Sequence, residues 1–206
     1  MHSDESEYLK ETARSYAAKK ENEIFTYGDY LLWDDGERWE LIEGTAYNMS
    51  PAPSSEHQKI LFEIARKFAD FFEDKPCQVF IAPFDVRLPE DDERDESIET
   101  DVQPDISVIC EKSKIDTKGC KGSPTMVVEV LSPNTSKKDL GEKLLLYEKH
   151  GVKEYWVIQP ADKTVLIFSQ DKMKLYGKPH VYGKEDTIKV SIFEGLEIDM
   201  NSVFET

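Results

Sequence analysis

Two carboxylates and one lysine in the middle of the sequence have the types and spacing to act together. Asp105 begins one predicted strand, Glu129 stands inside the apolar run of the next strand, and Lys143 lies on the helix predicted after it. Carboxylates from neighbouring strands can share one hard divalent cation, and the main-chain carbonyl of Val130 could add a ligand, because Mg²⁺ prefers oxygen. A nearby ammonium could position water or stabilise charge that develops on a phosphate. The pattern therefore predicts a Mg²⁺ site, with Mn²⁺ as a substitute.

Each of these residues also has an ordinary structural interpretation. A buried carboxylate needs a partner, so backbone donors or Lys143 alone could satisfy Glu129. Asp105 could be a turn residue at the entry to its strand. Lys143 could simply pair with Asp139, four residues earlier on the same helix. We favour the metal site because the three residues occur together.

Hydrophobic periodicity predicts the elements that position these residues. Helices are predicted over 25–33, 54–74 and 134–151, with Thr26, Ser54 or Ser55, and Asn134 or Thr135 as N-caps and Gly151 after the last helix. Strands are predicted over 38–42, 45–49, 77–88 (bent at Pro83), 103–110, 125–132, 154–160 and 164–170, followed by a hairpin around 176–183 and a closing segment at 188–199. The continuous apolar character of 125–132 predicts a central strand covered on both faces. This order predicts a mixed α+β fold, with one sheet flanked by helices.

Size and charge limit the classes of function. The chain has 206 residues, and we expect an N-terminal extension over 1–22 followed by one domain over 23–206. Its formal net charge of −16 disfavours nonspecific coating of DNA but does not exclude a local basic groove. Residues 89–101 hold eight acids and one arginine, which predicts a solvated, mobile loop.

The cysteines and the hydropathy indicate an ordinary intracellular protein. Cys77, Cys110 and Cys120 are odd in number and include no CxxC pair, so we expect reduced thiols rather than a disulfide scaffold or a zinc site. No stretch is long and apolar enough to span a membrane, and the N-terminal residues lack the apolar core of a secretory signal. We therefore expect a cytoplasmic location and no membrane partner.

Several stretches together resemble a known family. "GERWELIEGTAYNMSPAPSSEHQ", "PDISVI", "EVLS" after an apolar run, "DLGEKLLLY" and "HGVKEYWVIQP" resemble the putative restriction endonuclease family of the PD-(D/E)XK nuclease superfamily, from about Phe25 to Phe204. The resemblance implies a restriction-endonuclease-like fold and Mg²⁺-dependent hydrolysis of phosphodiesters. It assigns Asp105 to the Asp of the motif and Glu129 to its acidic (D/E) position.

The third position of the motif departs from the family pattern. Two residues after Glu129, where the motif has lysine, this chain has Leu131. Asp139, Lys143 and Tyr147 are spaced four residues apart on the following helix, so their side chains share one face. Some branches of the superfamily carry the lysine on this helix, and Lys143 fits that migrated position better than Lys137 or Lys138 near the helix start.

Four residues are second-shell candidates: Glu40, His57, Asp85 and Asp139. His57 begins the helix at 54–74, although a histidine there is more often a capping or surface group. Related nucleases recruit an extra acid from an N-terminal element, and Glu40, between Trp39 and Leu41, resembles a surface acid less than Glu43 or Glu63 does. Asp85 could border the site. Tyr147, Tyr155 and Trp156 are predicted core aromatics with hydrogen-bonded polar atoms.

These observations lead to one main expectation and two rivals. We expect a metal-dependent DNA endonuclease that acts through Asp105, Glu129 and Lys143. One rival is a nuclease-fold binding module with a degenerate site, favoured by Leu131 and the net charge. The other is a metal-dependent hydrolase of a different phosphoester. A homodimer is expected by analogy, because a duplex has two strands to cut.

Overall fold

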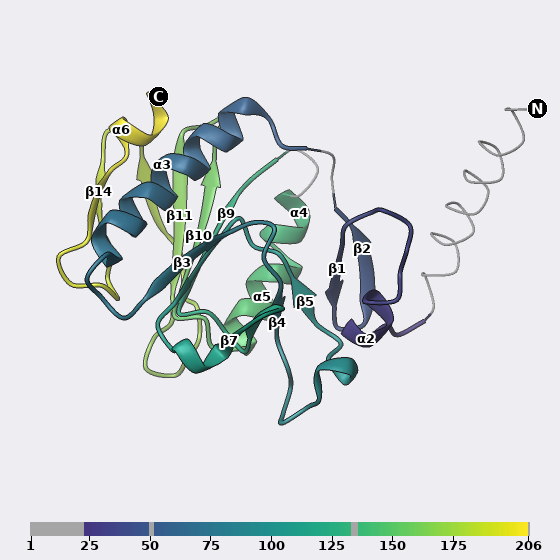
Figure 1. Ribbon diagram of the computed structural model, residues 1–206. Coiled ribbons are helices and arrows are strands. Elements are labelled where there is room, and N and C mark those ends of the chain that lie inside the picture. The colour runs from purple at the N-terminus through teal and green to yellow at the C-terminus, as the bar shows by residue number, and fades with distance from the viewer. Residues whose placement is uncertain (1–22, 50–51, 133–135, 206) are drawn as a thin grey trace, which may run out of the picture. The chain divides into compact units, whose positions relative to one another are not determined.

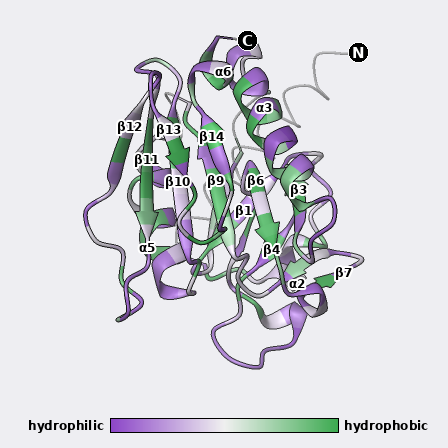
Figure 2. Cartoon of the chain, turned by 90° about the vertical axis from the view of Figure 1, so that its left-hand side faces the viewer, coloured by the Kyte–Doolittle hydropathy of each residue, from purple (hydrophilic) through white to green (hydrophobic). Residues whose placement is uncertain are grey.

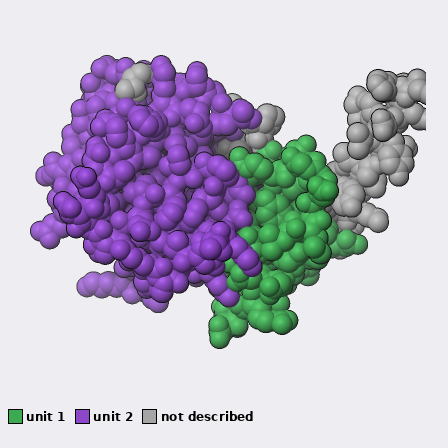
Figure 3. All heavy atoms as spheres, in the orientation of Figure 1, with its two compact units in different colours: residues 1–49, 87–102 green, residues 50–86, 103–206 purple. Residues whose placement is uncertain are grey.

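The structure, a computed structural model, describes residues 23–49, 52–132 and 136–205, which fall into two compact units. The first unit takes residues up to Met49 together with 87–102, and the second takes 50–86 and 103–206 (Figure 3). The extension predicted over 1–22 and the caps predicted at Asn134 or Thr135 lie outside the described residues.

The described residues form short runs of strands separated by helices and turns (Figure 1). The helices are α2 (Tyr27–Tyr30), α3 (Ser55–Phe72), α4 (Ser136–Asp139), α5 (Glu142–Lys149) and α6 (Asn201–Phe204), with 3-10 turns η1 (Asp95–Ser97) and η2 (Lys112–Lys114). The strands are β1 (Trp39–Ile42), β2 (Thr45–Asn48), β3 (Gln78–Ile81), β4 (Val86–Arg87), β5 (Asp101–Val102), β6 (Ile106–Ile109), β7 (Ile115–Asp116), β8 (Gly119–Lys121), β9 (Met126–Val130), β10 (Glu154–Gln159), β11 (Thr164–Ser169), β12 (His180–Gly183), β13 (Thr187–Lys189) and β14 (Glu197–Asp199). The predicted α+β class is confirmed. No helix in the described ranges has the length and apolar character needed to cross a membrane.

A six-stranded mixed sheet is the centre of the second unit. Its strand order is β12-β11-β10-β9-β6-β3, with β9 parallel to β10 and antiparallel to β6. Every residue of β9 is buried, so the predicted central position of this strand is confirmed. Because β6 and β9 run in opposite directions, the start of β6 lies beside the end of β9, and Asp105 is thereby brought close to Glu129.

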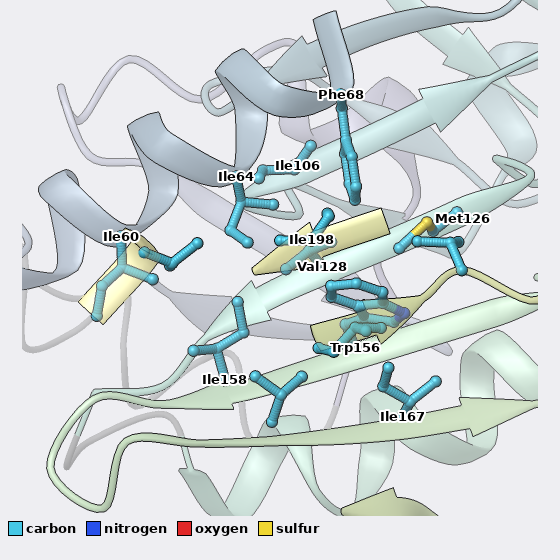
Figure 4. Close-up of a cluster of buried hydrophobic side chains, with 14 of the residues drawn as sticks. Ile60, Ile64, Phe68, Ile106, Met126, Val128, Trp156, Ile158, Ile167 and Ile198 are labelled. Carbon is cyan, nitrogen blue, oxygen red and sulfur yellow. The ribbon is translucent and has the colours of Figure 1, made fainter. Parts of the chain in front are cut away.

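One face of this sheet packs against α3. Ser54 caps the helix by accepting a hydrogen bond from the amide of His57, and the chain colours alternate along α3 as expected for an amphipathic helix (Figure 2). Its apolar side chains contact the even-numbered residues of β9, including Val128 (Figure 4). The cluster also takes residues from the hairpin of β13 and β14. Glu129, one residue on, must therefore face the opposite side of the sheet.

The opposite face is covered by α4 and α5. The sequence predicted one helix over 134–151, but the described part is two helices, separated at Leu140 and Gly141. Gly141 has φ −118° and ψ −89°, which is outside the helical region, and glycine tolerates such a conformation. The predicted end of α5 is confirmed, because His150 is the C-cap and Gly151 follows at φ +80°.

The first unit is built on the predicted hairpin. β1 pairs with β2 through a tight turn in which Glu43 and Gly44 both have positive φ, and β1 also pairs with β5. The acidic segment 89–101 was expected to be a solvated loop. Most of it is exposed, but Ile98 and Asp101 are fully buried, and Asp95 forms a 2.6 Å ion pair with the buried Arg87. Burial of an apolar side chain and pairing of a charge hold this segment in place.

Two further predictions about the second unit were wrong. The strand expected over 77–88 is two strands, β3 and β4, with a cis peptide bond between Ala82 and Pro83. Cys77 and Cys110 were expected to be free thiols but form a disulfide, since the pairing of β3 with β6 sets them opposite each other. Cys120 is buried and belongs to no disulfide, and its thiol donates a 3.2 Å hydrogen bond to the carbonyl of Gly122.

Candidate functional site

Asp105 and Glu129 meet where β6 begins and β9 ends. The amide of Val130 donates a 2.8 Å hydrogen bond to Oδ2 of Asp105, and the amide of Asp105 donates a longer one, 3.4 Å, to Oε2 of Glu129. Asp105 keeps 19% of its side chain exposed, whereas Glu129 keeps 6%. The pair therefore joins a buried carboxylate to one that has access to water.

Glu129 is held by two side chains of α5. Lys143 donates from Nζ to Oε1 of Glu129 at 2.7 Å, and the phenol of Tyr147 donates to the same oxygen at 3.1 Å. Lys143 and Tyr147 are one helical turn apart, so both reach the same point above the sheet. Leu131, which occupies the lysine position of the motif, is buried. The ammonium beside Glu129 thus comes from the helix.

Asp139 adds a third carboxylate next to the ion pair of Lys143 and Glu129. Its Oδ1 lies 3.7 Å from Nζ of Lys143, and its main-chain carbonyl accepts a 3.1 Å hydrogen bond from the phenol of Tyr155. Asp139 and Lys143 remain close to each other although the chain leaves the helical conformation between them, at Gly141. Burial, followed by the charges of Glu129 and Asp139, raises the pKa of Tyr155 well above its ordinary value, so this phenol remains protonated and donates.

His57 approaches Asp105 from the other face of the sheet. Its Nε2 lies 3.1 Å from Oδ2 of Asp105, and the residue is buried. Burial lowers the pKa of His57, but the hydrogen bond and the charge of Asp105 and the main-chain carbonyl of Val130 raise it, and the net pKa is above 6.5. Val130 therefore acts on the site through both of its main-chain groups, because its amide donates to Asp105 and its carbonyl raises the pKa of His57.

The donor set fits a hard cation. Asp105, Glu129 and Asp139 bring three carboxylates together with one lysine, so a divalent cation would offset an excess of negative charge. Within the described ranges, no group of three or more His, Cys, Asp or Glu side chains has the arrangement of a metal cage. Mg²⁺ commonly binds through one or two carboxylates and keeps several waters, so Asp105 and Glu129 meet its requirement.

The structure brings together most of the predicted site residues. Asp105, Glu129, Lys143, His57 and Asp139 are linked by the contacts above. Asp85 accepts a 2.9 Å hydrogen bond from Gln103, two residues before Asp105, and so borders the strand that begins the site.

Glu40 lies elsewhere in the chain's architecture. It is fully buried on β1, which belongs to the first unit, whereas all the other candidates belong to the second. Its predicted second-shell role stays a prediction.

One direct contact was missed by the sequence analysis. Tyr147 was expected only to be a core aromatic with a hydrogen-bonded hydroxyl, and its phenol in fact donates to Glu129 itself. For Tyr155 and Trp156, the sequence analysis likewise predicted a hydrogen-bonded polar atom without naming its partner. The signal was present, because Tyr147 follows Lys143 by four residues and must share its helix face.

The chain matches the model of a known protein family. The model of the family described as "Uma2: Putative restriction endonuclease" matches residues 27–201, which covers both units and every site residue named above. The chain belongs to this family.

Two individual proteins are also similar to this chain. A crystal structure described as a putative nuclease belonging to DUF820, from Anabaena variabilis, superposes with a TM-score of 0.68 at 21% sequence identity, over 87% of this chain and 97% of that one. This likeness establishes the shared fold. "Uncharacterized protein slr1290" of Synechocystis sp. is 26% identical over 121 residues, and the match spans 58% of this chain and 60% of that protein.

Proposed function

We propose that the protein is a metal-dependent DNA endonuclease that hydrolyses phosphodiester bonds at the end of β9. The observation that carries the proposal is the meeting of Asp105 and Glu129 on adjacent strands, with the amine of Lys143 2.7 Å from Glu129. Membership of the family described as putative restriction endonuclease supports a nuclease function in general. The metal, the substrate and the residue roles are our proposal.

In this proposal Asp105 and Glu129 hold Mg²⁺, with the Val130 carbonyl as a further oxygen ligand, and Mn²⁺ can replace it. When bound there, Mg²⁺ supplies Lewis-acid stabilisation of the phosphate and makes water a better nucleophile. Lys143 places a positive charge and three donors beside Glu129, where it can stabilise charge that develops on a phosphate oxygen. His57 orients the carboxylate of Asp105 through its 3.1 Å contact.

The family supports a nucleic-acid substrate, and the charge of the chain limits how that substrate can bind. With a net charge of −16, the protein repels DNA at long range, so productive binding depends on the cation and on local contacts. We therefore expect cleavage to require millimolar divalent ions rather than low salt alone. A homodimer that presents one site to each strand of a duplex is part of this proposal.

The test is plasmid cleavage with Mg²⁺ or Mn²⁺. We expect the wild type to nick or linearise the plasmid, EDTA to abolish cleavage, and Asp105→Asn and Glu129→Gln to lower the rate by about a hundredfold or more, because each removes a charged metal ligand. Asp162→Asn, the same change at an exposed position, is the matched control and keeps the wild-type rate. Equal activity in all of these preparations would show that the nicking comes from a contaminant or another site.

A binding module without catalysis is the second candidate, because Glu129 already has Lys143 and Tyr147 as partners. Isothermal titration with Mg²⁺ and Mn²⁺ separates the two candidates. A nuclease binds the ion with an affinity that Glu129→Gln reduces, whereas a degenerate module shows no site-dependent binding. Lys143→Met then impairs an enzyme and leaves DNA binding by a module unchanged.

A further inference from the structure

A second concave site lies at the far end of the same strands. A cavity of about 500 Å³ is lined by residues that follow β6, precede β9 and flank α5, all within the second unit. Thr125 lies one residue before β9, whereas Glu129 and Val130 are its last two residues. Five residues of extended strand span roughly 17 Å, so this cavity is separate from the candidate metal site.

The charge of the cavity is opposite to that of the protein. Lys114 and Lys153 both line it, against one carboxylate, Glu111. Glu111 and the main-chain carbonyl of Ser123 hold the amine of Lys114 at 3.0 and 3.2 Å. Lys153 is exposed and makes no ion pair within the ranges that the structure describes. In a chain with a net charge of −16, the one ammonium group left in excess here, that of Lys153, marks a place where an anion is favoured over the rest of the surface.

The remaining walls supply hydroxyl groups and an aromatic ring. Thr125 brings a hydroxyl into the lining that accepts from the amide of Cys110 at 3.3 Å and can still donate to a phosphate oxygen, whereas the hydroxyl of Ser123 donates to the main-chain carbonyl of His150. Phe193 lines another side, and its ring is held edge-to-face against Phe72 of α3 at a centroid distance of 4.8 Å. An aromatic ring fixed by core packing offers a surface for a flat ligand, and bases stack on such rings.

We propose that this cavity is a nucleotide-binding site, in which Lys153 and Lys114 contact the phosphate and Phe193 contacts the base. Its volume lies within the range of small-molecule sites. The shared chemistry is a phosphate monoester of a nucleoside, with the phosphate on the sugar that carries the base, supplied either by a free mononucleotide or by the phosphorylated end of an oligonucleotide. The site uses none of the residues assigned to cleavage, so it stands or falls independently of the proposed nuclease function.

The experiment is calorimetric titration of the whole chain in EDTA, which prevents cleavage and removes divalent ions. The probes are deoxyadenosine 5′-monophosphate, inorganic phosphate, unphosphorylated deoxyadenosine, and one short oligonucleotide with and without a 5′-phosphate. We expect the nucleotide to bind more tightly than either inorganic phosphate or the nucleoside. Tighter binding of the mononucleotide than of the phosphorylated oligonucleotide assigns the site to free nucleotides, and the reverse order assigns it to nucleic-acid ends.

Variants locate the binding in the cavity. We expect Lys153→Glu to weaken nucleotide binding by about tenfold or more, because it replaces attraction with repulsion at the phosphate. Lys114→Gln should weaken it as well. Lys172→Glu, the same charge reversal at an exposed position between β11 and β12, keeps the wild-type affinity. Absence of nucleotide binding to the folded wild type, wild-type affinity in Lys153→Glu, or equal affinity for inorganic phosphate and the nucleotide would overturn the proposal.

Discussion

Glu129 and Glu154 are buried carboxylates on neighbouring parallel strands, and they face opposite sides of the same sheet. Among the residues that the structure describes, the donors to Glu154 are neutral: the indole of Trp156 at 2.7 Å, and the hydroxyls of Ser169 and Ser191 at 3.3 and 2.5 Å. Glu129 instead has the ammonium of Lys143 at 2.7 Å and lies beside Asp105, whose side chain is partly exposed. The two sites show two ways to satisfy a carboxylate that the chain takes out of water.

The difference is between a carboxylate held by neutral donors and a carboxylate paired with a cation. The donors around Glu154 come from β10, β11 and the β13–β14 connection, so this carboxylate joins segments of the core without a counter-ion. Glu129 is paired with a cation and has a second carboxylate next to it, an arrangement that costs more to bury. A site of this kind is more easily explained by a ligand that shares the carboxylates, and the predictions below test that explanation.

The largest expected effect is on stability, when each of the two carboxylates is replaced by an amide of the same shape. Glu129→Gln should lower the free energy of unfolding by about 3 kcal/mol, because the buried ammonium of Lys143 is left with the more distant Asp139 as its carboxylate. Glu154→Gln should cost less than about 1 kcal/mol, because the amide can donate to Ser169 and Ser191 while its oxygen still accepts from Trp156. Urea denaturation of both variants measures this. Equal losses would mean that the two carboxylates are held alike.

The next effect is stabilisation by metal. At a free Mg²⁺ concentration of about 100 times the dissociation constant, the wild type should gain about 2.7 kcal/mol, because the ion binds the folded state. Glu154→Gln should keep this gain and Glu129→Gln should lose it, as followed by urea denaturation with and without Mg²⁺. If Mg²⁺ still stabilised Glu129→Gln, the metal would bind somewhere other than the end of β9.

The smallest effect compares single hydroxyl deletions. Tyr147→Phe removes a donor to Glu129, and Ser169→Ala removes a donor to Glu154, so each should cost about 1 kcal/mol of stability. Only Tyr147→Phe should also change the dissociation constant for Mg²⁺, because only this hydroxyl contacts a proposed metal ligand. Calorimetric titration of the two variants gives the answer, and an altered Mg²⁺ affinity in Ser169→Ala would contradict the comparison.

Local pattern was sufficient for most of the elements. The apolar run around Glu129 predicted a central strand, and the hairpin of β1 and β2 followed from its turn residues. The helical spacing of Asp139, Lys143 and Tyr147, together with the family resemblance, pointed to Lys143, and its amine does contact Glu129. These elements can be predicted from the sequence because side-chain periodicity and capping act over a few residues.

Other features depended on neighbours far along the chain. The helix expected over 134–151 is interrupted at Gly141, and the acidic segment is held by Arg87 and by the burial of Ile98. The disulfide between Cys77 and Cys110 arises because β3 and β6 pair in one register. A count of cysteines could not anticipate that register, since pairing joins residues that are distant in sequence.

By itself, the sequence determined the strand and helix pattern, the acidic balance, and the candidacy of Asp105, Glu129 and Lys143. The tertiary structure decided that these three meet, that His57 reaches Asp105 from the opposite face of the sheet, and that Tyr147 contacts Glu129. The physical reason is the antiparallel pairing of β6 with β9 and the packing of α5 above it. Both bring together groups whose separation in sequence carries no information about their distance in space.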